Sequence, residues 1–165
     1  MADSGNIITT APTEQQLWQF SLALYPKVQP LCLEWQDNLG VNINLLLLLC
    51  YLEQQQLSLT QPQLLQLTAE LEQFSRQFTQ PLRALRRKSH LATLSLTQQQ
   101  QLKQTLLQAE LELEKLEQQL LLQHCPALTR VTSPLLDHYL ALLTDNTISY
   151  QQPLFDLRQA ISQLA

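Results

Sequence analysis

Two leucine-rich stretches decide the fold of this chain. Residues 60–78 read TQPQLLQLTAELEQFSRQF, and residues 97–123 read TQQQQLKQTLLQAELELEKLEQQLLLQ. Each stretch begins with a predicted capping box, Thr60 with Gln63 and Thr97 with Gln100, and then places apolar residues three and four positions apart. The two seams consist of Leu64, Leu67, Leu71, Phe74, Phe78 and, past a kink at Pro81, Leu85; and of Leu102, Leu106, Ala109, Leu113, Leu116 and Leu120. These spacings predict a long antiparallel helical hairpin over 61–123.

Further helical patterns lie on the N-terminal side of this hairpin. A capping box at Thr13 begins a helix that we expect to end at Pro26, because proline cannot donate the helical hydrogen bond. A second helix is predicted from Pro30 to about Asn38, with Gly40 following it. Asn42 or Asn44 then caps a third helix, whose run Leu45–Leu49 is apolar all round and is therefore predicted to form the centre of the core.

Composition supports a helical class. Roughly one residue in four is leucine and roughly one in six is glutamine, both good helix formers, whereas β-branched residues are scarce. We therefore predict an all-α, single-domain helical bundle of about six to seven helices. Residues 1–12 are expected to be a flexible N-terminal tail and residues 13–165 one helical domain. Within that domain, residues 126–165 are expected to form C-terminal helices that begin near Pro134 and Pro153.

Charge, cysteines and hydropathy narrow the setting. A net charge of −4 and a pI near 5.3 argue against broad nucleic-acid binding, which needs an extended basic surface. Cys32, Cys50 and Cys125 are odd in number and lie in apolar surroundings, which indicates reduced thiols. No signal peptide is evident, and the longest apolar run, 45–52, is far shorter than the roughly 20 residues of a membrane helix. We therefore expect a cytoplasmic protein without membrane insertion.

A cluster of cations is the first candidate site. Arg83, Arg86, Arg87 and His90 fall within about 100° of one another on a helix. The antiparallel pairing places Gln100 and its neighbours opposite them, which offer no carboxylate. Three interpretations stay open: a solvated face favoured by the helix dipole, a contact with the acidic surface of a partner, or a phosphate or RNA contact.

A polar junction between two apolar helices is the second candidate. Asp37, Asn42 and Asn44 could converge with the arginines into a small pocket for an anion. The alternative is structural: the asparagines cap a helix, and Asp37 pairs with an arginine.

Other chemistry has little support in the sequence. His90, His124 and His138 lack metal-ligand spacing, and no glycine-rich loop could hold a nucleotide. The series Glu110, Glu112, Glu114 and Glu117 is interpreted as an exposed helix face. We thus predict no catalytic residues, no metal and no cofactor, and whether the protein is an enzyme stays open, with the balance against it.

Several motifs taken together resemble those of a family of uncharacterised proteobacterial proteins, a domain of unknown function. They are Leu17-Trp18-Gln19-Phe20 with Leu22-Ala23-Leu24-Tyr25, Cys32-Leu33-Glu34-Trp35-Gln36-Asp37, Gly40, Asn44-Leu45-Leu46-Leu47, and Pro81-Leu82-Arg83-Ala84-Leu85-Arg86-Arg87. The resemblance extends over about residues 14–120. It departs at Cys50-Tyr51 and at Phe74 and Phe78, where such proteins often have tryptophan. It implies a bacterial cytosolic protein and supplies no activity.

From these observations we predict a non-enzymatic protein-interaction module that binds an unidentified cytosolic protein through the hairpin or the arginine patch. The alternative is a site for a small anion, a phosphate-bearing ligand or RNA at Arg83–Arg87. Homo-oligomerisation through the heptad helices is a third possibility.

Overall fold

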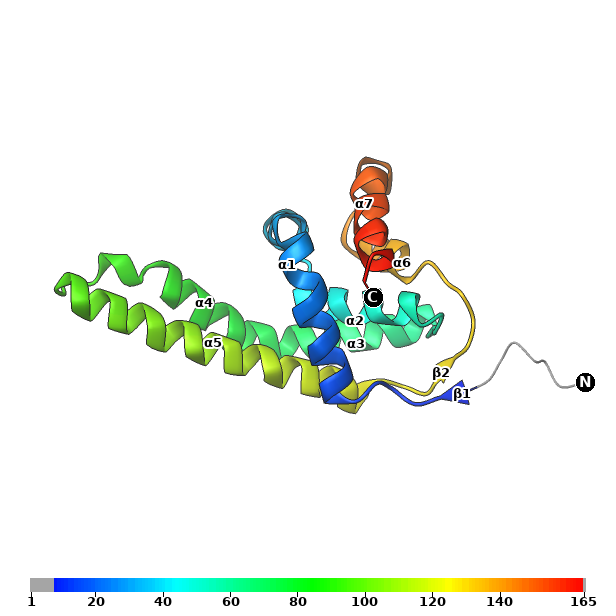
Figure 1. Cartoon of the computed structure of the whole chain (residues 1–165), viewed down its shortest axis with the longest axis horizontal. Helices are drawn as coiled ribbons and strands as arrows, with labels where there is room; N and C mark the ends of the chain where they lie inside the picture. The colour runs from blue at the N-terminus through cyan, green and yellow to red at the C-terminus, as the bar shows by residue number, and fades with distance from the viewer. Residues whose placement is uncertain (1–7, 165) are drawn as a thin grey trace, which may run out of the picture.

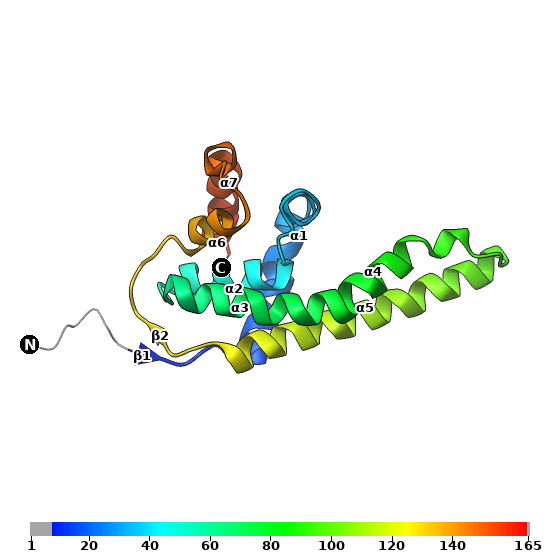
Figure 2. The same cartoon turned by 180° about the vertical axis from the view of Figure 1, so that it is seen from behind.

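The computed structural model describes residues 8–164 and is built almost entirely of helices. Figures 1 and 2 show two parts: a body formed by α1, α2, α6 and α7, and a long two-helix arm that projects from it. The arm comprises residues 61–124, which fold as a helical hairpin. The prediction of an all-α bundle with a long antiparallel hairpin is therefore confirmed.

Helix α1 (Glu14–Leu39) runs through both of the prolines that were expected to separate two helices. That prediction is wrong because Leu22, Pro26 and Pro30 lie four residues apart on one exposed face, where water can bond the carbonyls that lack amide donors. The prolines bend the helix without breaking it: Figure 1 shows its first half along the page and its second half end-on. Gly40, with φ 73°, ends the helix as predicted.

Helix α2 (Ile43–Gln54) lies at the centre of the body and contacts α1, α5, α6 and α7. Its residues Leu45–Cys50 are all buried, so the prediction that this run forms the centre of the core is confirmed. A helix that is apolar on every side needs neighbours on every side, and the bent α1 and the C-terminal helices supply them.

The outgoing half of the arm is one continuous helical path. It consists of α3 (Gln61–Phe74), the π-helical segment η1 (Ser75–Thr79) and α4 (Gln80–Arg87). The π turn ends two residues before Pro81, which has no amide hydrogen and crowds the preceding turn of an α-helix. Leu64, Leu67 and Leu71 are buried as the seam predicts, but Phe78 and Leu85 are 51% and 46% exposed. The seam fails there because the distal arm is only two helices thick.

The arm returns through the short 3₁₀ segment η2 (Ser89–Leu91) and helix α5 (Leu96–His124). The capping box of α5 is Ser95 with Gln98, two residues before the predicted one. The predicted leucine seam on α5 is also largely wrong: the buried residues are Leu106, Glu110, Glu117, Gln118 and Leu121. Because α5 packs against α1 and α2 as well as against the other arm helices, the face turned to the body is the buried one.

The C-terminal segment crosses back to the body. Strand β2 (Leu128–Thr129) pairs antiparallel with β1 (Ile8–Thr9), and Ser58 joins Thr129 in an isolated bridge. Helices α6 (Leu135–Leu143) and α7 (Gln151–Ser162), linked by the 3₁₀ turn η3 (Thr147–Tyr150), then cover α2. The predicted flexible tail over 1–12 lies in part outside the described residues, while Ile8 and Thr9 form this strand.

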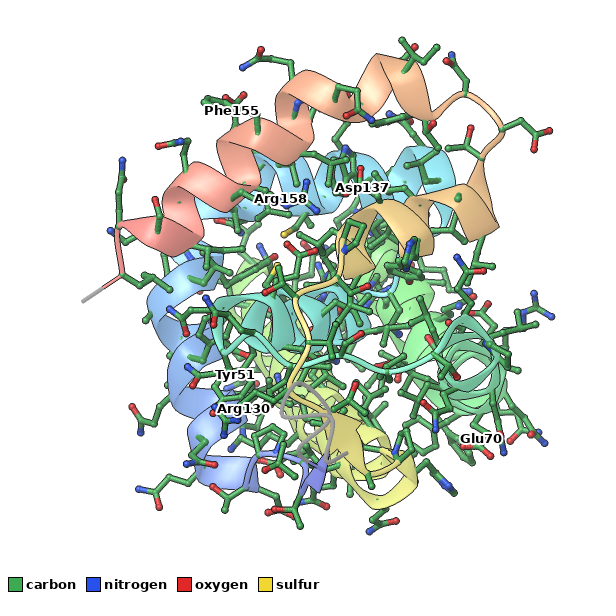
Figure 3. The ribbon with its side chains drawn as sticks, turned by 90° about the vertical axis from the view of Figure 1, so that its right-hand side faces the viewer. Tyr51, Glu70, Arg130, Asp137, Phe155 and Arg158 are labelled. Carbon is green, nitrogen blue, oxygen red and sulfur yellow. The ribbon has the colours of Figure 1, made fainter. Side chains whose placement is uncertain are left out.

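An ion cluster fastens the C-terminal helices to α2. Arg158 donates to both carboxylate oxygens of Glu53 at 2.9 and 3.0 Å and to Asp137 at 2.6 Å. Glu53 also accepts the backbone N–H of Leu136 at 2.8 Å, at the start of α6. Figure 3 shows Arg158 of α7 beside Asp137 of α6, with Phe155 on the outer side of the helix. The cluster therefore joins three helices through one guanidinium.

In the part of the chain that the structure describes, none of the helices is both long enough and apolar enough to traverse a lipid bilayer.

Candidate functional site

A pocket of ≈ 830 Å³ opens where the arm leaves the body. One wall is α1 together with the turn at Gly40–Asn42 and the start of α2; the opposite wall is the α3–η1–α4 path, and α5 forms the third side. This volume falls within the range of small-molecule sites in proteins. The bend of α1 and the N-terminal cap of α2 thus position one wall against the arm.

Five of the seven predicted site residues line this pocket: Asp37, Asn42, Asn44, Arg83 and Arg87. Arg86 and His90 do not. The Nδ1 atom of His90 lies 3.0 Å from the carbonyl oxygen of Arg87, on the exposed side of the arm. The structure therefore brings most of the predicted set together around one concavity, and it places the remaining two residues outside.

The two inner arginines have a carboxylate partner that the sequence interpretation did not foresee. Arg83 donates to Glu110 at 3.1 Å, and Arg86 donates to both oxygens of the same carboxylate. Burial acts to raise the pKa of Glu110, but the hydrogen bonds from Arg86 and Arg83 outweigh it, so the pKa lies below its ordinary value. The expectation that the opposite helix of the hairpin offers these arginines no carboxylate is therefore wrong.

The outer arginine is paired more loosely. Arg87 Nη2 lies 3.7 Å from Asp37 Oδ1, and both side chains are more than half exposed. An exposed pair at this distance contributes little to stability. All three arginines thus have acidic partners, and an incoming anion would compete with Glu110 or Asp37. The predicted anion site stays a prediction, and these ion pairs count against it.

The asparagines and their neighbours form a buried hydrogen-bond network at the base of the pocket. Asn42 caps α2 by accepting the N–H of Leu45 at 3.1 Å, and its Nδ2 donates to Glu117 Oε1 at 2.8 Å. Gln118 Nε2 donates to Asn44 Oδ1 at 3.2 Å and to Ser21 Oγ at 3.1 Å. Asn42 therefore has the structural capping role and also fixes a pocket carboxyl.

Glu114 and Glu117 set the charge of the pocket. Within residues 8–164, neither has a lysine or arginine within ion-pair distance. Burial raises the pKa of Glu114 to about 7, and the nearby carboxylate of Glu110 adds to the effect. Burial likewise raises the pKa of Glu117, against the lowering by its hydrogen bond from Asn42. A carboxyl that titrates near neutrality inside a pocket is a common feature of functional sites.

These carboxyls correct a second expectation. The glutamates of α5 were interpreted as an exposed face, yet Glu110 and Glu117 are 7% and 1% exposed, and Glu114 is partly buried. Only Glu112 faces solvent, where it pairs with Lys115 at 3.6 Å.

Apolar side chains line the mouth and one wall. Trp18, Leu22 and Tyr25 come from α1, Leu47 from α2 and Leu111 from α5. The ammonium of Lys115 lies 5.4 Å from the ring centroid of Trp18, a cation–π distance. The pocket therefore has carboxyls on the α5 side and an aromatic and aliphatic surface, mainly from α1, beside them.

Nucleophilic and metal chemistry finds little support near the pocket. The three cysteines are unpaired, and burial raises the pKa of Cys32 to about 12 and that of Cys125 to about 11, so neither is a thiolate at neutral pH. Among residues 8–164, no group of three or more His, Cys, Asp or Glu side chains is arranged to hold a metal ion.

The sequence contained a signal for the missed carboxyls. Glu110, Glu114 and Glu117 are spaced by four and three residues, and Leu106 and Leu121 continue the same stripe four residues before and after. A stripe that includes two buried leucines is one helix face, so its glutamates share their burial. Ser21 and Gln118, which hydrogen-bond across the network, carry no such signal.

Comparison with known proteins places the chain without assigning an activity. No curated protein and no solved structure matches it. A family model described as "Protein of unknown function (DUF2390)" matches residues 16–121. Every residue that lines the pocket, from Trp18 to Gln118, falls in that range. The match covers more than half of the sequence, so the chain belongs to this family of unknown function. A domain of unknown function is also what the motifs predicted.

Proposed function

We propose that the protein binds a small organic cation, an amine with an apolar or aromatic body, in the pocket between the arm and the body. The observation that carries the proposal is the pair Glu114 and Glu117, two pocket carboxyls without a cationic partner among the described residues. An ammonium group would supply the missing positive charge, and the wall of Trp18, Tyr25 and Leu47 suits the rest of the molecule.

The charge pattern around the pocket favours a cation over an anion. Arg83 and Arg87 are already paired with Glu110 and Asp37, and Glu72 is paired with Arg76 at 2.9 Å. After these pairs are formed, neither pocket glutamate has a cation within ion-pair distance. Because Glu110 is shared by two arginines, one positive charge is left to offset one glutamate, and one carboxylate stays without a counter-charge. A bound ammonium would also favour the ionised form of Glu114 and so lower its pKa from about 7.

A matched set of three small molecules tests this proposal. Tryptamine is the cation, tryptophol is its neutral counterpart, and indole-3-propionate carries the opposite charge on the same ring. We expect tryptamine to bind at least about tenfold more tightly than the other two, measured from amide chemical-shift changes in NMR titrations. Its affinity is expected to rise as the pH passes upward through about 7, as Glu114 ionises.

Two variants locate the effect. Glu114→Gln keeps the shape of the side chain and removes its charge, so it should abolish the pH dependence and most of the preference for tryptamine. Glu112→Gln, two residues away on the opposite, exposed face of the same helix, is the matched control and should leave both unchanged. Tighter binding of indole-3-propionate, or an unchanged preference in Glu114→Gln, would contradict the proposal.

The predicted protein-interaction role and homo-oligomerisation stay predictions. Both were expected to involve the arm, and the free end of the arm offers a surface separate from the pocket.

A further inference from the structure

The tip of the arm, residues 88–96, exposes leucine where a helical hairpin ordinarily exposes polar residues. Leu91, Leu94 and Leu96 are 71%, 43% and 80% exposed, and all three lie at or beside the connection between α4 and α5. Figures 1 and 2 show this connection as the free end of the arm, at the point farthest from the body. A cluster of exposed apolar side chains indicates a surface that is covered in some functional state.

The arm is also the basic part of an acidic protein. Residues 73–109 contain no aspartate or glutamate, and they hold six of the ten lysines and arginines of the chain. Arg83 and Arg86 are paired with Glu110. Lys88 and Lys103 are exposed and form no ion pair with any residue described. The tip therefore combines exposed leucines with unpaired cations a few residues behind them.

We infer that the tip of the arm binds the surface of an anionic lipid membrane. Leucine side chains enter the boundary between headgroups and acyl chains, and lysines behind them attract acidic headgroups. The geometry favours lipid over a protein, because a convex end needs a matching hollow in a protein partner but none in a fluid bilayer. No segment spans the membrane in this arrangement; the contact is confined to the tip.

Flotation with vesicles tests the inference. The protein is incubated with vesicles of phosphatidylcholine alone, and with vesicles of equal parts phosphatidylcholine and phosphatidylglycerol. We expect binding to the mixed vesicles only, weakened by high salt because the attraction is electrostatic. Charge reversal by Lys88→Glu changes the charge by two and should weaken binding by about 25-fold, since each charge near the surface is worth about fivefold.

The apolar contribution is separated by a triple variant. Leu91→Ser, Leu94→Ser and Leu96→Ser together should abolish flotation; because these side chains are exposed, unfolding in urea should be nearly unchanged. Ile148→Ser, at a residue 84% exposed on the body, and Lys27→Glu, at an exposed lysine of α1, are the matched controls and should float like the natural protein.

Three results would overturn the inference. The first is that the protein floats with neither type of vesicle. The second is that the triple variant floats as well as the natural protein, and the third is that the protein prefers polyglutamate or RNA to mixed vesicles. The last result would reassign the tip to an acidic protein or to nucleic acid. A fluorescent label at Ser95→Cys, with a matched label at Ser162→Cys on α7, gives an independent readout: only the first should shift to the blue with mixed vesicles.

Discussion

Two groups of partly buried charges in this molecule use the same residue types and differ in how their charges are matched. On the C-terminal side, Arg158 is enclosed by Glu53 and Asp137, and a backbone N–H completes the hydrogen bonding of Glu53. None of these three side chains lines the pocket. In the arm, Glu110 forms ion pairs with Arg83 and Arg86. The same helix face continues with Glu114 and Glu117, which line the pocket.

Under the proposed function, the difference separates a structural cluster from a ligand-binding one. A buried charge that is fully paired serves the fold, since any change of partner leaves an unsatisfied group. A pocket carboxyl without a cation lowers the stability of the empty protein and is retained where it serves a ligand or a reaction. The comparison therefore predicts that variants of the two clusters change stability in opposite directions.

Removal of the cation from the closed cluster should have the largest effect. Arg158→Met leaves Glu53 and Asp137 facing each other without a guanidinium between them. Breaking a buried pair costs about 3–5 kcal/mol, and the 36% exposure of Arg158 reduces this to about 2–3 kcal/mol. The measurement is the free energy of unfolding in urea.

The matched variant removes the whole cluster. Arg158→Met combined with Glu53→Gln and Asp137→Asn should recover at least half of the loss, because no charge is then left unpaired. If the single variant is as stable as the natural protein, the cluster does not hold α7 and α6 on α2.

The paired part of the arm cluster should show an intermediate effect. Glu110→Gln leaves two guanidinium groups without a carboxylate and should lower the free energy of unfolding by about 2 kcal/mol at neutral pH. Because the pKa of Glu110 is lowered in the folded state, this stability is present above the ordinary glutamate pKa of 4.5 and is lost as the pH falls through the folded-state value. The variant and the natural protein should therefore converge in acid; a constant difference across pH would show a packing effect.

The unpaired part should show the smallest effect, with the opposite sign. The pKa of Glu114 is raised from 4.5 to about 7, so the folded state binds more protons than the unfolded state between these values. Stability of the natural protein should fall as the pH rises across this interval and then stay level. Glu114→Gln removes this loss and should be more stable above pH 7. The full difference in pKa corresponds to about 3 kcal/mol, which the partial exposure of Glu114 reduces to about 1–2 kcal/mol.

Chemical denaturation at a series of pH values measures the effect. The difference between Glu114→Gln and the natural protein should vanish near pH 4.5, where the carboxyl is protonated in the folded state. A variant that is less stable than the natural protein at high pH would show that Glu114 has a counter-charge that the geometry does not reveal.

The fold was largely predictable because it depends on periodicity. The hairpin follows from leucines spaced by three and four residues, and the central helix follows from the run Leu45–Leu49. The continuity of α1 was not predictable from local rules. Pro26 and Pro30 end helices in most contexts, and only their shared exposed face, which depends on the packing of the opposite face, allows the helix to continue.

The sequence predicted the polar residues at one wall of the pocket, but it did not predict the glutamates that give the pocket its negative charge. Asp37 and Asn42 were identified because they belong to a polar junction between two apolar helices, and Arg83 because it belongs to a cluster of cations on one helix face. Glu114 and Glu117 were missed because charged residues on a long helix are usually solvated. Their spacing places them on one helix face with Leu106 and Leu121, but that this face is the buried one follows from α1 and α2 packing across α5, a long-range contact.

The ionisation of Glu114 in the free protein and in the presence of tryptamine tests the central claim most directly. The measurement is an NMR titration of the glutamate side-chain carboxyl carbons, with Glu114→Gln and Glu117→Gln used for assignment. We predict a pKa of about 7 for Glu114 in the free protein and a fall when tryptamine is added. A value near the ordinary 4.5 that tryptamine does not change would contradict a desolvated carboxyl waiting for a cation.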